Sequence, residues 1–195
     1  DMCAAYWFAV DSLRNVYVYK EFCQSNLPIS AAASAILNYT EPSEKIYQVL
    51  APPDLWNRSQ ETGKSKALLF SENGLTLSKS NNDREAGWLA IKELLQTDQS
   101  GESRLHIFRN CTQLIKYLPA LQRDPKHPTD TMNEPHEITH SPDALRYFAI
   151  YWVSPAPNNG VKKVKYRADW LEDYRNASSE EERQRIIKKH GGMPE

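Results

Sequence analysis

Residues 4–22 read AAYWFAVDSLRNVYVYKEF, two runs of strand-forming side chains separated by a short polar segment. The first run, residues 4–10, is almost wholly apolar or aromatic, and the second begins with alternating valine and tyrosine at residues 16–19. Aromatic and β-branched residues favour strands, and residues 11–15 carry the Asp, Ser and Asn typical of turns. This pattern predicts an antiparallel β-hairpin at the start of the chain.

Beyond the hairpin, helical and strand-like segments alternate. Apolar residues at helical spacing predict helices over residues 27–39, 62–73, 82–96 and 111–121, and another that opens at Ser141-Pro142. Short β-type runs at residues 45–50, 75–80 and 104–108 predict strands between them. Helices that alternate with strands, after a hairpin, predict an α/β domain in which helices flank a mixed sheet.

The composition excludes several classes of protein. The chain has 195 residues, of which 40% are hydrophobic and 25% charged, as in ordinary globular domains and unlike disordered or collagen-like chains. It lacks the run of about 18 apolar residues that a membrane-spanning helix needs, and residues 1–10 lack the pattern of a secretory signal. Three cysteines, widely spaced, predict neither a disulfide scaffold nor a cysteine-based zinc site.

Two segments interrupt this alternation. Residues 124–139 are rich in Pro, Asp, His and Thr without periodicity, which predicts a long working loop. Residues 154–160 read SPAPNNG and mark a domain edge, so we predict a domain over residues 1–153 and a linker with a charged helical tail over residues 154–195.

The net charge of the chain is close to zero. Because 24 basic residues are balanced by 25 acidic ones, the totals show no strong electrostatic attraction to nucleic acid. Local candidates for phosphate contact are Lys162, Lys163, Lys165 and Arg167, although the sequence favours a solvated basic linker over this interpretation.

Asp54 is the first candidate for chemistry. It follows a predicted strand and two prolines, and open α/β sheets bind their ligands beyond the carboxyl ends of strands. One interpretation makes Asp54 a metal-binding carboxylate, and the other makes it part of an ordinary turn.

His140 and Asp143 are the second candidates, because they lie three residues apart where the last predicted helix begins. An aspartate in the first turn of a helix also stabilises the helix dipole, and a histidine before the cap is often solvated, so a purely structural role is the alternative. Together with Asp54 they offer two carboxylates and an imidazole, a ligand set that suits Mg²⁺ or Mn²⁺. Two such ions are the usual apparatus for in-line hydrolysis of a phosphodiester.

Two other patterns are weaker. Gly63-Lys64-Ser65 matches the end of a phosphate-binding loop, but Arg58 stands where the leading glycine belongs, so we interpret the segment as the start of a helix. His127 and His136 lie in the long loop, where single histidines usually face solvent.

The sequence resembles the nuclease domain of the large terminase subunit of tailed phages over about residues 1–153. The resemblance rests on KIYQVLAPPDLW (residues 45–56), TGKS (62–65), NDR (82–84), GW (87–88) and above all EPHEITHSPDALRYF (134–148). It implies a ribonuclease H-like fold and a metal-dependent endonuclease that cuts concatemeric double-stranded viral DNA with two Mg²⁺ or Mn²⁺ ions. Asp54 and Asp143 match the family's carboxylates, and His140 matches a histidine that some members use.

The resemblance also implies partners and a setting. An ATPase domain precedes the nuclease domain in the family, and the portal protein and the small terminase subunit act with it, in the host cytoplasm and transiently at the procapsid portal. No membrane is involved. The family's first strand carries an Asp-x-Gly motif, whereas this chain opens at Asp1-Met2-Cys3, which aligns just after that motif. We therefore expect the first strand and its carboxylate to be missing here, with Asp1 as an alternative metal ligand.

Two alternatives to the packaging nuclease stay open from the sequence. A non-catalytic module would contribute only a surface for DNA or the portal. A ribonuclease H-like nuclease with another substrate would cut a Holliday junction or an RNA–DNA hybrid.

Overall fold

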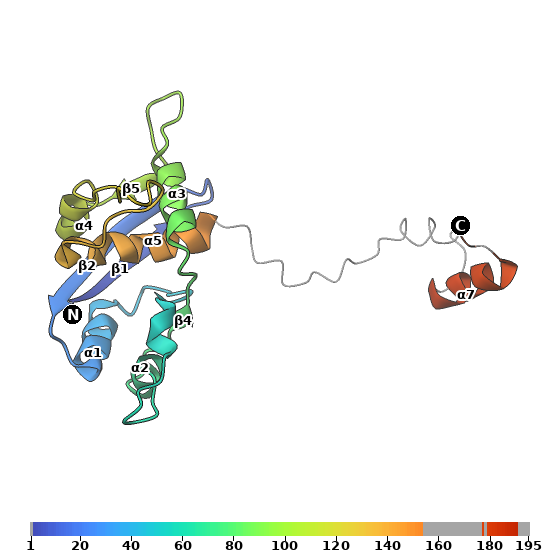
Figure 1. The fold of residues 1–195 in the computed structure, drawn as a ribbon, viewed down its shortest axis with the longest axis horizontal. Coiled ribbons are helices and arrows are strands. Elements are labelled where there is room, and N and C mark those ends of the chain that lie inside the picture. The colour runs from blue at the N-terminus through green and yellow to red at the C-terminus, as the bar shows by residue number, and fades with distance from the viewer. Residues whose placement is uncertain (1, 154–176, 178, 191–195) are drawn as a thin grey trace. The chain divides into compact units, whose positions relative to one another are not determined.

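The computed structural model describes residues 2–153, 177 and 179–190 (Figure 1). The chain divides into two units, with the division between residues 154 and 155. In the second unit the described part is helix α7 (Glu180–His190), whose first turn holds three glutamates that favour the helix N-terminus. Asp1 and the basic residues 162–167 lie outside the described residues, so the predictions that concern them are not addressed.

The hairpin predicted from residues 4–22 forms two neighbouring strands of a mixed three-stranded sheet. Strand β1 (Met2–Val10) pairs antiparallel with β2 (Val16–Ser25), with an irregularity between Trp7 and Phe8. Strand β5 (Leu105–Ile107) pairs parallel with β2, which gives the order β1-β2-β5. The first unit is therefore a mixed α/β structure in which helices flank a small mixed sheet, as the alternation of elements predicts.

A separate two-stranded parallel sheet joins β3 (Leu50–Ala51) to β4 (Ser78–Lys79). The strand predicted over residues 45–50 is wrong for most of its length, because residues 45–49 are not strand and Ile46 and Tyr47 are exposed. Within the described residues, the backbone hydrogen bond that joins this run to another strand is the one from the Ser78 amide to the Val49 carbonyl, at 2.7 Å, and β-branched composition alone does not make a strand without pairing.

The helices fall where the apolar periodicity places them, and all but the last are shorter than predicted. Ser65 accepts a hydrogen bond from the Leu68 amide and so caps α2, while Asp83 caps α3 through the Ala86 amide. The predicted cap at Ser141 is wrong, because the last helix begins one residue earlier and Ser141 is buried inside it. The helices of this unit are α1 (Ile29–Tyr39), η1 (Pro53–Trp56), α2 (Lys66–Glu72), α3 (Arg84–Leu95), α4 (Thr112–Tyr117), η2 (His136–Ile138) and α5 (His140–Val153).

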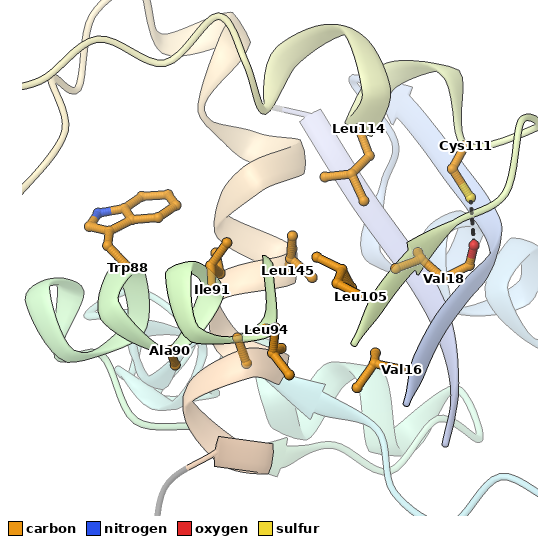
Figure 2. Packing of buried hydrophobic residues seen from close by; sticks show 11 residues of the cluster. Val16, Val18, Trp88, Ala90, Ile91, Leu94, Leu105, Cys111, Leu114 and Leu145 are labelled. Carbon is orange, nitrogen blue, oxygen red and sulfur yellow. Dashed lines mark hydrogen bonds between the residues drawn. The ribbon is translucent and has the colours of Figure 1, made fainter. Parts of the chain in front are cut away.

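The core lies between the sheet and the pair α3 and α5 (Figure 2). Trp88, Ile91 and Leu94 of α3 meet Leu145 of α5, and fully buried Val16 and Val18 come from the middle strand. Helix α5 also contacts β1 and β3, so it touches both sheets. The position of α5 therefore determines which of the loops that follow the strands lie beside this helix.

Among the described residues, no helix is both long and apolar enough to span a bilayer.

Candidate functional site

The carboxyl ends of β3 and β4 meet the middle of α5. Asp54 lies in η1, the short helix that follows β3, and its side chain is exposed. The buried hydroxyl of Ser80, just after β4, donates to the Tyr147 carbonyl at 2.9 Å. Asp143 lies in the first turn of α5. The two predicted carboxylates thus come from elements that this helix brings together.

The pKa of the Tyr147 phenol reflects the charges of the two predicted carboxylates. Burial raises the pKa of its phenol, and the nearby charges of Asp143 and Asp54 raise this pKa further, while Arg146 acts in the opposite sense. Like charges disfavour the phenolate only when they are close to it. Asp54 and Asp143, far apart in the sequence, therefore both act electrostatically on this hydroxyl group, Asp54 the more weakly.

Asp143 is held by two guanidinium groups. The Nε of Arg146 donates to Asp143 Oδ1 at 2.8 Å, and Nη1 of Arg84 lies 3.5 Å from the same oxygen. The side chain of Arg146 is 1% exposed, whereas that of Asp143 is 24% exposed. Asp143 thus supplies the counter-charge of a buried cation, which is the kind of structural role that its place in the helix also allows.

Arg84 extends this network to the long loop. Its Nε donates to both carboxylate oxygens of Asp130, and the indole N–H of Trp88 donates to Asp130 Oδ1 at 2.8 Å. Burial by itself would raise the pKa of Asp130, but Arg84, the Thr131 amide and Trp88 outweigh it and hold that pKa below its ordinary value. The predicted working loop is consequently tied to α3 at one point.

Arg146 completes the network on the side of Asn82. Its Nη2 donates to Asn82 Oδ1 at 3.3 Å, and the Tyr147 hydroxyl donates to the same oxygen at 2.9 Å. Nη1 of Arg146 is buried and has no hydrogen-bond partner within the described part of the chain. The guanidinium also lies over the Tyr147 ring, 4.4 Å from its centroid.

His140 lies at the start of α5, beside a second histidine. Its ring is half-buried and meets the exposed His136 ring edge-on, with centroids 4.4 Å apart. Burial lowers the pKa of His140, the neighbouring His136 lowers it further, and Asp143 raises it. The lowered pKa favours the neutral imidazole, the form that binds metals.

The three predicted ligands are chemically suited to a divalent cation, but they are not grouped into a metal centre. No described donor reaches the carboxylate of Asp54 or Oδ2 of Asp143, so both have lone pairs to offer. Among the described residues, however, no three His, Cys, Asp or Glu side chains are grouped so that they could hold an ion. The metal site therefore stays a prediction.

Sequence reasoning missed the arginines around Asp143. Two signals pointed to them: an arginine at position 146 within the apolar face of α5, and a glycine at position 87 inside a helix, which often marks a close approach. Only the packing of α3 on α5 shows that the two features belong together.

Comparison with models of known families, with curated proteins and with solved structures finds no match to this chain.

Proposed function

We propose that this chain is the ribonuclease H-like catalytic domain of a divalent-metal-dependent DNA endonuclease. The observation that supports the proposal best is that Asp54 directly follows β3 while Asp143 lies in the first turn of α5, the helix that packs against β3. Carboxylates brought together from a strand end and a helix start are what metal-dependent phosphodiester hydrolysis requires.

Bound Mg²⁺ or Mn²⁺ would supply an activated water and neutralise the charge on the scissile phosphate. Asp54 presents an exposed carboxylate on η1, and Asp143 presents Oδ2 while Arg146 holds its Oδ1. His140 contributes a neutral imidazole nitrogen from the start of α5. Each donor is positioned by an element end, so the site depends on how α5 packs against β3.

Arg146 and Arg84 act on Asp143 from within the protein. A ligating carboxylate is oriented by the hydrogen bonds that its other oxygen accepts, and such bonds are a common part of metal sites. Arg146 is fixed because it is buried, so it restricts the rotation of the Asp143 carboxylate. Its positive charge also lowers the affinity of the pair for a cation, which makes Asp54 the more important electrostatic ligand.

The resemblance to terminase nuclease domains extends the proposal to viral DNA packaging. In that setting the substrate is concatemeric double-stranded DNA, and an upstream ATPase domain, the portal protein and the small terminase subunit are the partners. The mixed sheet with flanking helices and the α5 position of Asp143 are compatible with this assignment.

A plasmid-cleavage assay in Mn²⁺, on the natural full-length polypeptide that contains this sequence, tests the proposal. Asp54→Asn and Asp143→Asn should each reduce cleavage by at least about a hundredfold, since each removes a charge that binds the ions. Glu102→Gln, an exposed acid in the loop before β5, is the matched control and should cut as fast as the parent. Full cleavage by both aspartate variants would rule the assignment out.

The ion pairs of Asp143 favour a second candidate, a non-catalytic module that binds DNA or the portal. In that case Asp143 serves only to neutralise Arg146, and Asp143→Asn destabilises the fold without affecting any cleavage. Binding of DNA or portal without metal-dependent cleavage would support this candidate. Preferential cleavage of a Holliday junction or an RNA–DNA hybrid would instead indicate a related nuclease with another substrate.

A further inference from the structure

A hollow of about 620 Å³ lies beside η1, between the loop of residues 58–65 and the N-terminal part of α2. Its lining combines an aromatic ring, a cation and small polar groups. The residues that matter here are Trp56, Arg58, Ser65, Ser71 and Thr76. None of them is one of the three predicted metal ligands.

Trp56 places an aromatic surface and a positive charge at the same point. It is the last residue of η1, two positions after Asp54, and its indole ring lines the hollow. The ammonium of Lys79, an exposed residue of β4, lies 5.4 Å from the centroid of this ring. A half-buried indole beside an ammonium that no described carboxylate pairs with suits a nucleic-acid strand, because bases stack on aromatic rings and phosphates attract cations.

Arg58 is presented by a closed loop. An isolated antiparallel bridge joins Arg58 to Ser65, the Ser59 amide donates to the Lys64 carbonyl at 3.0 Å, and the Gly63 amide donates back to the Ser59 carbonyl at 2.9 Å. Gly63 has a positive φ of 66°, which suits the glycine at this turn. The loop therefore holds Arg58 at the edge of the hollow through its own backbone.

The charge of Arg58 is available to a ligand. Lys64, on the same loop, is neutralised by Glu72 at 2.8 Å, whereas no carboxylate within the described residues pairs with Arg58 or Lys79. Glu61 is exposed in the same loop and reduces the local positive charge. Charge alone would consequently bind an anionic ligand only weakly here, so contact with the Trp56 ring is needed as well.

We propose that this hollow binds an unpaired nucleic-acid strand, with a base stacked on Trp56 and neighbouring phosphates bound by Arg58 and Lys79. Its place two residues from Asp54 would set the position of the strand relative to the reacting phosphate, and that part of the inference rests on the proposed function. Strand binding itself does not, because it involves neither carboxylates nor metal.

Fluorescence anisotropy with a short labelled single-stranded oligonucleotide, in EDTA, tests the hollow separately from cleavage. Trp56→Ala should weaken binding at least about fivefold and leave its salt dependence unchanged, since stacking releases no counterions. Arg58→Gln should also weaken binding and reduce the slope of log K against log salt by about 0.7, the contribution of one phosphate contact. Arg104→Gln, which removes the same charge beside β5, is the matched control.

An abasic oligonucleotide separates stacking from charge. The parent should bind it more weakly than the normal strand, and Trp56→Ala should bind the two strands equally. Asp54→Asn should bind the oligonucleotide as the parent does, so that full cleavage by this variant, with binding intact, overturns only the proposed nuclease. If Trp56→Ala and Arg58→Gln bind like Arg104→Gln, or if the parent prefers blunt duplex to single strand, the inference is wrong.

Discussion

Gly87 on α3 lies so close to Arg146 on α5 that a methyl group at Gly87 would overlap the Cγ atom of Arg146. The glycine therefore admits the aliphatic stem of a buried arginine between two helices. The guanidinium at the end of this stem reaches Asp143, so a glycine on one helix determines how a candidate metal ligand on the other is held.

Gly87→Ala should lower the free energy of unfolding by about 1–3 kcal/mol through overpacking, although alanine favours helix by up to about 1 kcal/mol. Urea denaturation measures the change. Leu89→Ala on the exposed side of the same helix is the control and should shift stability by no more than about 0.5 kcal/mol. A Gly87→Ala variant that is more stable than the parent would show that α3 and α5 are not packed this closely.

Arg146→Ala should lower the free energy of unfolding by about 3 kcal/mol, because it removes a buried cation and leaves Asp143 without its closest partner. Replacement of both residues, Arg146→Met with Asp143→Leu, should cost less than Arg146→Ala alone, since no uncompensated charge stays behind. Chemical denaturation of the two variants makes the comparison. The ion pair would have no structural role if the double variant were the less stable one.

Stability should fall with pH below about 4, in part through Asp130. The pKa of this carboxyl is lower in the folded chain than its ordinary value of 3.8, so its contribution is complete above that value and is lost as the pH falls through the folded pKa. Asp130→Asn should therefore be less stable than the parent at pH 6 but should lose less stability on acidification. Unfolding curves between about pH 3 and 7 test this, and parallel pH profiles would refute it.

His140 should titrate below its ordinary pKa of 6.5. Since the unfolded chain then binds the proton more readily than the folded one, stability is complete above 6.5 and is lost as the pH falls through the folded pKa. His136→Ala should raise the pKa of His140, and Asp143→Asn should lower it further. NMR titration of the imidazole resonances measures both shifts, and an unchanged pKa in both variants would place His140 away from these neighbours.

The hairpin and the amphipathic helices were predictable because their patterns are local. Alternating valine and tyrosine at residues 16–19 form the middle strand, and the apolar face that includes Leu94 packs into the core. The extent of the strand predicted over residues 45–50 could not be read from the local pattern, because pairing in a sheet depends on a neighbouring strand far away in the sequence. Only Leu50 and Ala51 find such a neighbour, in β4.

The candidate site shows the same difference between what a local sequence pattern predicts and what tertiary packing decides. The sequence pattern predicted Asp54, His140 and Asp143 as residues of the types that bind cations, and that choice stays a prediction, because the described residues do not group them as a centre. It did not show that Arg146 and Arg84 bind Asp143, because Arg84 lies on another helix and an arginine three residues along is normally exposed. Burial of that arginine follows from Gly87, which only tertiary packing reveals.

Direct titration with Mn²⁺, followed by the loss of the free-ion EPR signal, is the sharpest test of whether Asp54 and Asp143 share a cation. In the natural polypeptide, Asp54→Asn and Asp143→Asn should each weaken Mn²⁺ binding, and the double variant should bind little worse than the weaker single one, because both residues serve one site. Independent, additive losses, or Mn²⁺ affinity that neither substitution changes, would contradict the shared site.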